Sequence, residues 1–185
     1  MYIHGGGFVP GSAVASKEYS SMLAKYSGCK VIAVDYALAP EYSFPHGFND
    51  CFDAFCQIIK MYPEAKITLI GESAGANLCL ALELKVKNMN KVSCIIVHSP
   101  FVDFTDSLDR TEHEIDDFTV KQGCLKPLRQ IYVGENEADN PLVFPIFGDY
   151  VDFPPTFITC DYHETLYADA IALYKNVNKR VFMSS

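Results

Sequence analysis

Short apolar runs alternate along the chain with longer segments in which apolar residues recur at helical spacing. The run from Lys30 to Val34 is rich in β-branched residues, as is typical of a strand buried on both faces of a sheet. Such runs predict strands at 30–34, 66–70, 92–97 and 155–160, and helical patterns cover 48–59, 74–86 and 166–177. Strands that alternate with helices favour one α/β domain over residues 1–185, with a mostly parallel sheet and helices on both faces.

Two stretches interrupt this alternation, an acidic one at 103–117 and a loop-like one at 135–150 that contains two prolines and a glycine. Both come after predicted strands. Because sites in open parallel sheets form at the carboxyl ends of the strands, we expect both stretches near that edge.

Charge and cysteine content narrow the possible partners. The 185 residues include 23 acidic against 15 basic side chains, which gives a net charge of −8. Such a chain is a poor partner for nucleic acid or anionic lipid, and no apolar run reaches membrane-spanning length. The seven scattered cysteines form no C-x-x-C pair, which favours a reducing compartment. We therefore expect a cytoplasmic protein with no nucleic-acid partner and no membrane span.

The sequence Gly71-Glu72-Ser73-Ala74-Gly75 carries the strongest chemical signal. This G-x-S-x-G pattern follows a predicted strand and opens a predicted helix, which is the setting that a nucleophile elbow requires. The two glycines permit a turn too tight for a Cβ, and the turn pushes the Ser73 hydroxyl out above the sheet. A structural serine in a glycine-rich turn is the simpler alternative.

A second glycine motif lies at the start of the chain, where His4-Gly5-Gly6-Gly7-Phe8 follows the apolar Tyr2-Ile3. Three glycines allow backbone N–H groups to approach a ligand closely. In acyl transfer, such groups stabilise the negative charge that develops on the tetrahedral intermediate. We interpret His4 as a brace for the glycine loop and not as a general base.

The two motifs together resemble the hormone-sensitive-lipase-like family of α/β-hydrolases, which includes bacterial carboxylesterases. Other segments resemble that family in the same order, although Ala37 stands where the family usually has arginine; the matching segments are 35–41, Phe44-Pro45, 99–103 and 154–158. The resemblance implies an α/β-hydrolase fold and a serine nucleophile at Ser73. It also implies an oxyanion hole built from the backbone N–H groups of Gly6, Gly7 and Ala74.

The family's catalytic acid has two candidates in this sequence. Glu164-Thr165-Leu166 resembles the family's D-x-L-like motif after the penultimate strand, and Asp161 lies three residues earlier, where glycine is more usual. The resemblance favours Glu164 over Asp161. The acid would orient a histidine and stabilise its charged form. A carboxylate at a helix N-terminus, stabilised by the helix dipole, is the structural alternative for Glu164.

The order of the triad in this fold is serine, acid, histidine. The five histidines are His4, His46, His98, His113 and His163, so none follows Glu164. We therefore expect a partial core that lacks the family's first strands, cap, and last strand and helix. His98 and His163 are possible substitutes for the missing base.

The sequence thus predicts a carboxylic-ester hydrolase that acts on a small-molecule ester without metal or organic cofactor. The absence of the catalytic histidine predicts impaired activity. The alternative is a non-catalytic small-molecule binder or degenerate homologue on the same scaffold. An exposed sheet edge in an incomplete core would also pair with a second copy, so we expect a homo-oligomer.

Overall fold

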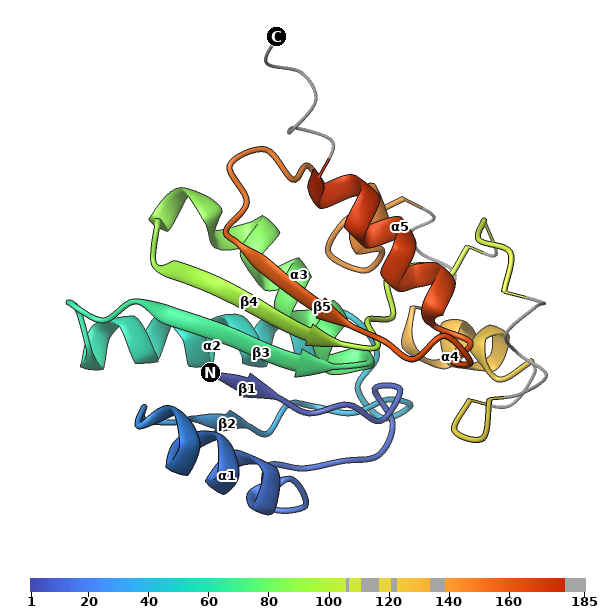
Figure 1. The fold of residues 1–185 in the computed structure, drawn as a ribbon. Coiled ribbons are helices and arrows are strands. Elements are labelled where there is room, and N and C mark those ends of the chain that lie inside the picture. Colours follow the sequence, from blue (N-terminus) through green and yellow to red (C-terminus); the bar gives the residue numbers. More distant parts are fainter. Residues whose placement is uncertain (106, 111–116, 121–122, 134–138, 179–185) are drawn as a thin grey trace, which may run out of the picture.

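The computed structural model describes residues 1–105, 107–110, 117–120, 123–133 and 139–178. Five parallel strands form one sheet, in the order β2-β1-β3-β4-β5 (Figure 1). The strands are β1 (Tyr2–Ile3), β2 (Ala33–Val34), β3 (Ile67–Glu72), β4 (Val92–His98) and β5 (Thr156–Thr159). The predicted parallel α/β architecture is therefore confirmed.

Helices α1 to α4 lie between strands in the sequence and α5 follows β5; α3 packs against β1, β3 and β4, and α5 against β5. In Figure 1, α2 and α3 lie behind the sheet and α1 lies in front of it. The α-helices are α1 (Lys17–Ser27), α2 (His46–Met61), α3 (Ala74–Val86), α4 (Leu125–Tyr132) and α5 (Tyr167–Asn178), and two 3₁₀ turns are η1 (Lys87–Met89) and η2 (Pro145–Phe147).

The observed bounds agree most closely with the predicted ones for α3 and β4. The helix predicted over 74–86 has those bounds, and the strand predicted at 92–97 extends by one residue to His98. The strand predicted at 30–34 is shorter, because only Ala33 and Val34 pair with the two-residue β1. The pattern did not predict α1 or α4.

The core lies between the sheet and α3. Eleven of the thirteen residues of α3 are buried, because this helix contacts β1, β3 and β4 as well as α2. Alternate residues of the central strands, such as Leu69, Ile95 and Val97, point toward it and are fully buried. The Ala- and Leu-rich composition of α3 thus reflects burial on all sides.

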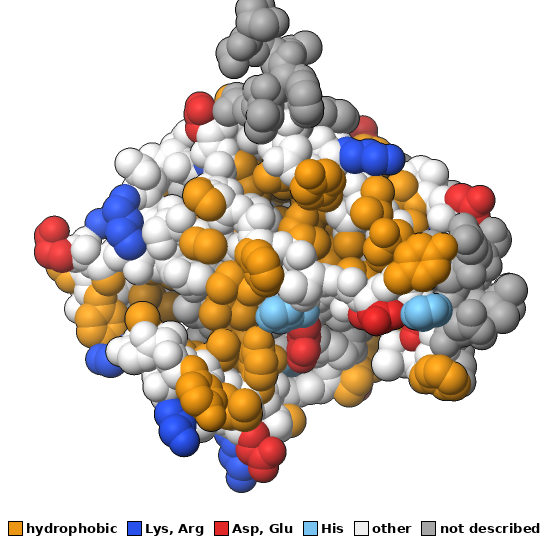
Figure 2. Space-filling model, in the orientation of Figure 1, with side chains coloured by type: hydrophobic (Ala, Val, Ile, Leu, Met, Phe, Trp, Pro, Cys, Tyr) orange, Lys and Arg blue, Asp and Glu red, His pale blue; other side chains and the backbone are white. Residues whose placement is uncertain are grey.

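The opposite face of the sheet is less covered. Ile70, Ile96 and Phe157 are register partners on three neighbouring strands and so point to the same side. Ile70 and Ile96 are half-buried, and Phe157 is 60% exposed. Apolar side chains gather on this face in the space-filling view (Figure 2). None of the described helices combines the length and apolar character that crossing a bilayer requires.

Candidate active site

Ser73 occupies a strained turn between β3 and α3. Its backbone adopts φ +50° and ψ −115°, a conformation that non-glycine residues rarely occupy. A Cβ on Gly71 would collide with the backbone of Gly75, and a Cβ on Gly75 would collide with the carbonyl oxygens of Ile3 and His4. The two glycines are therefore required by close backbone packing on both sides of the serine.

The backbone of Ser73 is held firmly, while its hydroxyl does not cap the helix that follows. The Ser73 N–H donates to the carbonyl of His98 at 2.9 Å, and the Ser73 carbonyl accepts from Asn77 N–H at 3.1 Å. Although Ser73 stands at the N-cap of α3, its side chain makes no capping hydrogen bond. The hydroxyl is therefore available for chemistry at the positive end of a buried helix.

The glycine loop lies directly beside this turn. Register pairing of Ile3 with Gly71 brings the carboxyl ends of β1 and β3 together, so the loop that follows β1 faces Ser73. Gly6 and Gly7 have φ values of +110° and +60°, and a Cβ on Gly6 would collide with the carbonyl of Pro10. These conformations favour glycine and leave the loop backbone accessible to a ligand.

His4 lies beneath the glycine loop and is buried. Its Nδ1 lies 2.8 Å from the Gly5 carbonyl oxygen, and its ring stacks on Tyr36 with centroids 4.4 Å apart. The Tyr36 hydroxyl donates to the His4 carbonyl at 2.9 Å. These contacts brace the loop from below.

The other end of the loop is anchored on α4. Phe8 is buried and stacks on Tyr132 of α4, with ring centroids 3.7 Å apart. A Cβ on Gly7 would lie 3.1 Å from the Leu128 side chain, which places α4 directly over the loop. The loop conformation therefore depends on an aromatic contact with a helix distant in sequence.

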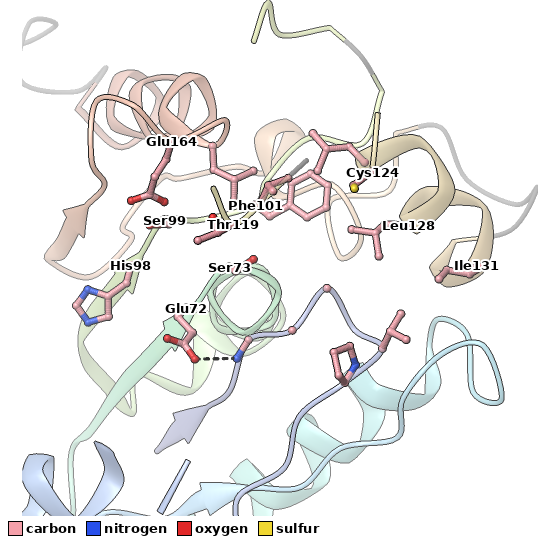
Figure 3. A pocket seen from close by; sticks show the side chains of 18 residues that line it. Glu72, Ser73, His98, Ser99, Phe101, Thr119, Cys124, Leu128, Ile131 and Glu164 are labelled. Atoms are coloured by element: carbon pink, nitrogen blue, oxygen red, sulfur yellow. Dashed lines mark hydrogen bonds between the residues drawn. The ribbon is translucent and has the colours of Figure 1, made fainter. Parts of the chain in front are cut away.

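A cavity of about 620 Å³ opens above Ser73. The elbow and the glycine loop form its floor, and Figure 3 shows their side chains together with those of the walls. One wall is largely apolar and comes from α4 and the segment before it, with Thr119, Val120, Leu125, Leu128 and Ile131. Its volume and apolar lining suit a small organic ligand.

The structure separates the two candidate acids. Glu164 is half-buried and lines the cavity, and its Oε1 accepts a hydrogen bond from Asp161 N–H at 2.9 Å. Burial and, to a smaller extent, the Glu164 charge raise the pKa of the neighbouring Cys160 thiol to about 12. The Asp161 side chain is 67% exposed and pairs with His163 Nδ1 at 3.0 Å. Asp161 is not among the residues found to line the cavity, so only Glu164 shares it with Ser73.

The two substitute histidines are engaged elsewhere. His98 lines the cavity, but Nδ1 lies 2.6 Å from the Thr159 hydroxyl and Nε2 lies 3.1 Å from the Tyr19 hydroxyl. His163 is exposed beside Asp161. His113 lies outside the described residues. Among the described histidines, no hydrogen bond to the Ser73 hydroxyl is recorded.

A family model described as the α/β-hydrolase fold matches residues 1–181. The chain belongs to this family. An esterase from Acinetobacter venetianus is 31% identical over 92% of this chain and 58% of its own length. An acetyl-hydrolase from Streptomyces hygroscopicus is 28% identical over 94% of this chain and 59% of its own. The chain therefore spans about three-fifths of the length of these two relatives.

Solved structures place the chain in the hormone-sensitive-lipase-like group. A hormone-sensitive lipase from a metagenome library superposes with a TM-score of 0.90 at 32% identity, covering 96% of this chain and 62% of that one. A hyperthermophilic esterase from Pyrobaculum calidifontis superposes with a TM-score of 0.88 at 29% identity, covering 97% and 61%. The resemblance inferred from the two glycine motifs is confirmed.

The residues of α4 that complete the cavity were not predicted from the sequence. The wall helix α4 is only eight residues long and contains Pro127, which breaks a helix interior but is tolerated in the first turn. Leu125, Leu128 and Ile131 recur at three-residue spacing, and this was the available signal. Within the described residues, no group of three or more potential ligand side chains is arranged to hold a metal ion.

Proposed function

We propose that this chain carries the nucleophile and oxyanion hole of a carboxylic-ester hydrolase that acts on a small-molecule ester. The observation that carries the proposal is the shared cavity: a strained Ser73 whose hydroxyl makes no capping bond faces a loop with Gly6 and Gly7 at positive φ. The esterases and acetyl-hydrolase to which the chain is similar support the same reaction class.

In the proposed acylation step, the Ser73 Oγ attacks the carbonyl carbon of the ester. The carbonyl oxygen becomes an oxyanion, and the backbone N–H groups of Gly6, Gly7 and Ala74 would donate hydrogen bonds to it. The N–H groups in the first turn of a helix lack intrahelical acceptors, so that of Ala74 is suited to this role. The alcohol leaves, and water then hydrolyses the acyl-enzyme.

The proton of Ser73 requires a base. Glu164 is placed in the cavity where it could orient an imidazole, but no histidine follows it in the sequence, and His98 is bound to Thr159 and Tyr19. Loss of a triad member commonly lowers kcat by a factor of about 10⁴ to 10⁶. We therefore expect slow acylation of Ser73 by reactive esters and little turnover by the chain alone.

Incubation with p-nitrophenyl acetate and butyrate, followed by intact-mass measurement, tests the proposal. We expect one acyl adduct per chain on Ser73, located by peptide mapping, and none on the Ser73→Ala variant. Ser93→Ala, at the opposite end of β4, is the matched control and should acylate like the unmodified chain. Rapid turnover lost in Ser73→Ala would identify a base within the chain. Absence of both adduct and turnover would sink the proposal and favour a non-catalytic binder.

We also propose that the chain self-associates through its β5 side. Within the described residues, β5 is one of the two edge strands of the sheet, and its Phe157 is 60% exposed. An edge strand beside exposed apolar surface can pair with a second copy. The cytoplasmic location expected from the seven cysteines remains a prediction; all seven are free thiols in the structure.

A further inference from the structure

The charge of the cavity is one-sided. Glu72 and Glu164 both line it, and in Figure 3 Glu164 lies above Ser73 and Glu72 below it. Within the described part of the chain, no lysine or arginine lines it. His98 also lines the cavity, with Nε2 3.1 Å from the Tyr19 hydroxyl and Nδ1 2.6 Å from the Thr159 hydroxyl. A ligand bound near Ser73 therefore meets two carboxylates and an otherwise mainly apolar wall.

The position of the Glu72 carboxylate is fixed by the loop beside it. Oε1 accepts hydrogen bonds from the Tyr2 hydroxyl at 3.2 Å and from Gly5 N–H at 3.4 Å, the second drawn in Figure 3. A Cβ on Gly5 would lie 2.9 Å from Glu72 Cγ, so the glycine loop packs directly on the Glu72 side chain. The charge is thus carried by the residue before Ser73 and held against the start of the glycine loop.

The groups around Glu72 do not neutralise it. Burial raises the pKa of Tyr2 to about 12, and the nearby Glu72 charge contributes to the rise. Burial also raises the pKa of Tyr19, with Glu72 again contributing. Both tyrosines are therefore uncharged near neutral pH, and the Tyr2 hydroxyl donates to the Glu72 carboxylate without cancelling its charge.

From this arrangement we infer that Glu72 is a specificity-determining residue that selects against esters with an anionic acyl group. The inference rests on the proposed function, because it assigns a substrate class to the same cavity. An anionic acyl group in the cavity would add a third negative charge to those of Glu72 and Glu164, and none of the described lining side chains is a lysine or arginine that could compensate it. An uncharged ester of the same length meets the same walls without this repulsion.

The effect is limited because Glu72 is exposed to solvent. Two unit charges several ångströms apart in a mostly aqueous surrounding change an equilibrium or rate by about threefold to tenfold. We therefore expect the chain to react with a neutral ester about ten times faster than with its anionic counterpart, since two carboxylates act together. Neutralising Glu72 alone should reduce that preference by about threefold.

Two 4-nitrophenyl esters of adipic acid test the inference. In the first, the other carboxyl group is free and negatively charged, and in the second it is an uncharged methyl ester. In each reaction the Ser73 Oγ bonds to the acyl carbon, 4-nitrophenolate leaves with the bonding electron pair, and the hydroxyl proton passes to buffer. The rate of adduct formation on Ser73 is measured by intact mass and divided by the rate of spontaneous hydrolysis of the same ester. The ratio of the two normalised rates is the preference.

Glu72→Gln keeps an oxygen that can accept from Tyr2 and Gly5 and removes only the charge. Glu64→Gln makes the same charge change at the other end of β3, before the strand begins, and is the matched control. We expect the preference to fall in Glu72→Gln and to remain in Glu64→Gln. In the unmodified chain, it should also fall as salt rises from about 0.01 M to about 1 M, because the screening length shrinks from about 30 Å to about 3 Å.

The outcomes separate the inference from the proposed function. Equal normalised rates for both esters, or a preference that neither salt nor Glu72→Gln changes, would overturn the role of Glu72 while leaving Ser73 as the nucleophile. Absence of adducts with both esters would overturn the proposed function and the inference together. If Glu72→Gln fails to fold, Glu72→Met, which removes the same charge, is measured in its place, and an unchanged preference in that variant would overturn the role of Glu72.

Discussion

At the scale of single residues, the strain at Ser73 depends on the glycine that follows it by two positions. Gly75→Ala would drive a Cβ into the carbonyl oxygens of Ile3 and His4, which belong to β1 and the start of the glycine loop. Because both obstacles are backbone, the elbow and the loop must separate. We expect a loss of about 3 kcal/mol or more in the free energy of unfolding, and loss of Ser73 acylation. Urea unfolding and adduct formation measure the two effects.

Gly28→Ala controls for the general cost of replacing a glycine. Gly28 ends α1 with φ +67°, and nothing lies within 4 Å of the position its Cβ would take. Only the left-handed backbone conformation opposes that alanine, at about 1 kcal/mol. Equal stability losses at the two sites would contradict the packing explanation for Gly75.

At the scale of elements, one carboxylate joins the segment after β4 to the loop that carries Glu164. Asp117 is 8% exposed and accepts hydrogen bonds from the N–H and hydroxyl of Thr119, from Val120 N–H, and from Thr165 N–H at 2.7 Å. Burial alone would raise the pKa of Asp117, but these hydrogen bonds outweigh it and hold the pKa well below its usual range. Asp117 therefore stabilises the fold in its charged form.

We expect Asp117→Asn to lower the free energy of unfolding by about 1–3 kcal/mol at pH 7. Since the folded-state pKa is depressed, the carboxylate's contribution is present above the ordinary aspartate pKa of about 3.9 and is lost as pH falls below it. The difference between the two proteins should therefore narrow below about pH 4. Urea unfolding at pH 7 and below about pH 4 checks this. Asp53→Asn, on the exposed side of α2, is the control. A difference independent of pH would contradict this explanation.

The elements also differ in how far the sequence predicts them. The helix at 74–86 and the strand at 92–97 follow from local composition, since α3 is largely buried and β4 is an interior strand of the sheet. The elbow and the glycine loop can also be predicted from the sequence, because backbone packing at these positions excludes any residue with a Cβ. The α4 wall and the bond from Asp117 to Thr165 are not, because they join segments far apart in sequence and depend on tertiary contacts.

At the scale of the whole molecule, the uneven cover of the sheet predicts association between copies. The face that carries Ile70, Ile96 and Phe157 is only partly covered. It extends to β5, one of the two edge strands of the described sheet. A second copy can add to this edge and cover the apolar face at the same time, which removes Phe157 from water. We expect a dimer or larger assembly in size-exclusion chromatography with light scattering, in proportions that rise with protein concentration.

Phe157→Ser should shift this equilibrium toward monomer, because it removes the most exposed apolar side chain of that row. Met61→Ser is the matched control: Met61 is 59% exposed but lies at the end of α2, away from β5. If general surface hydrophobicity caused association, the two variants would weaken it equally. If the β5 edge causes it, only Phe157→Ser will do so. A chain that is monomeric at every concentration would contradict the prediction, and the half-covered face would then be tolerated as ordinary protein surface.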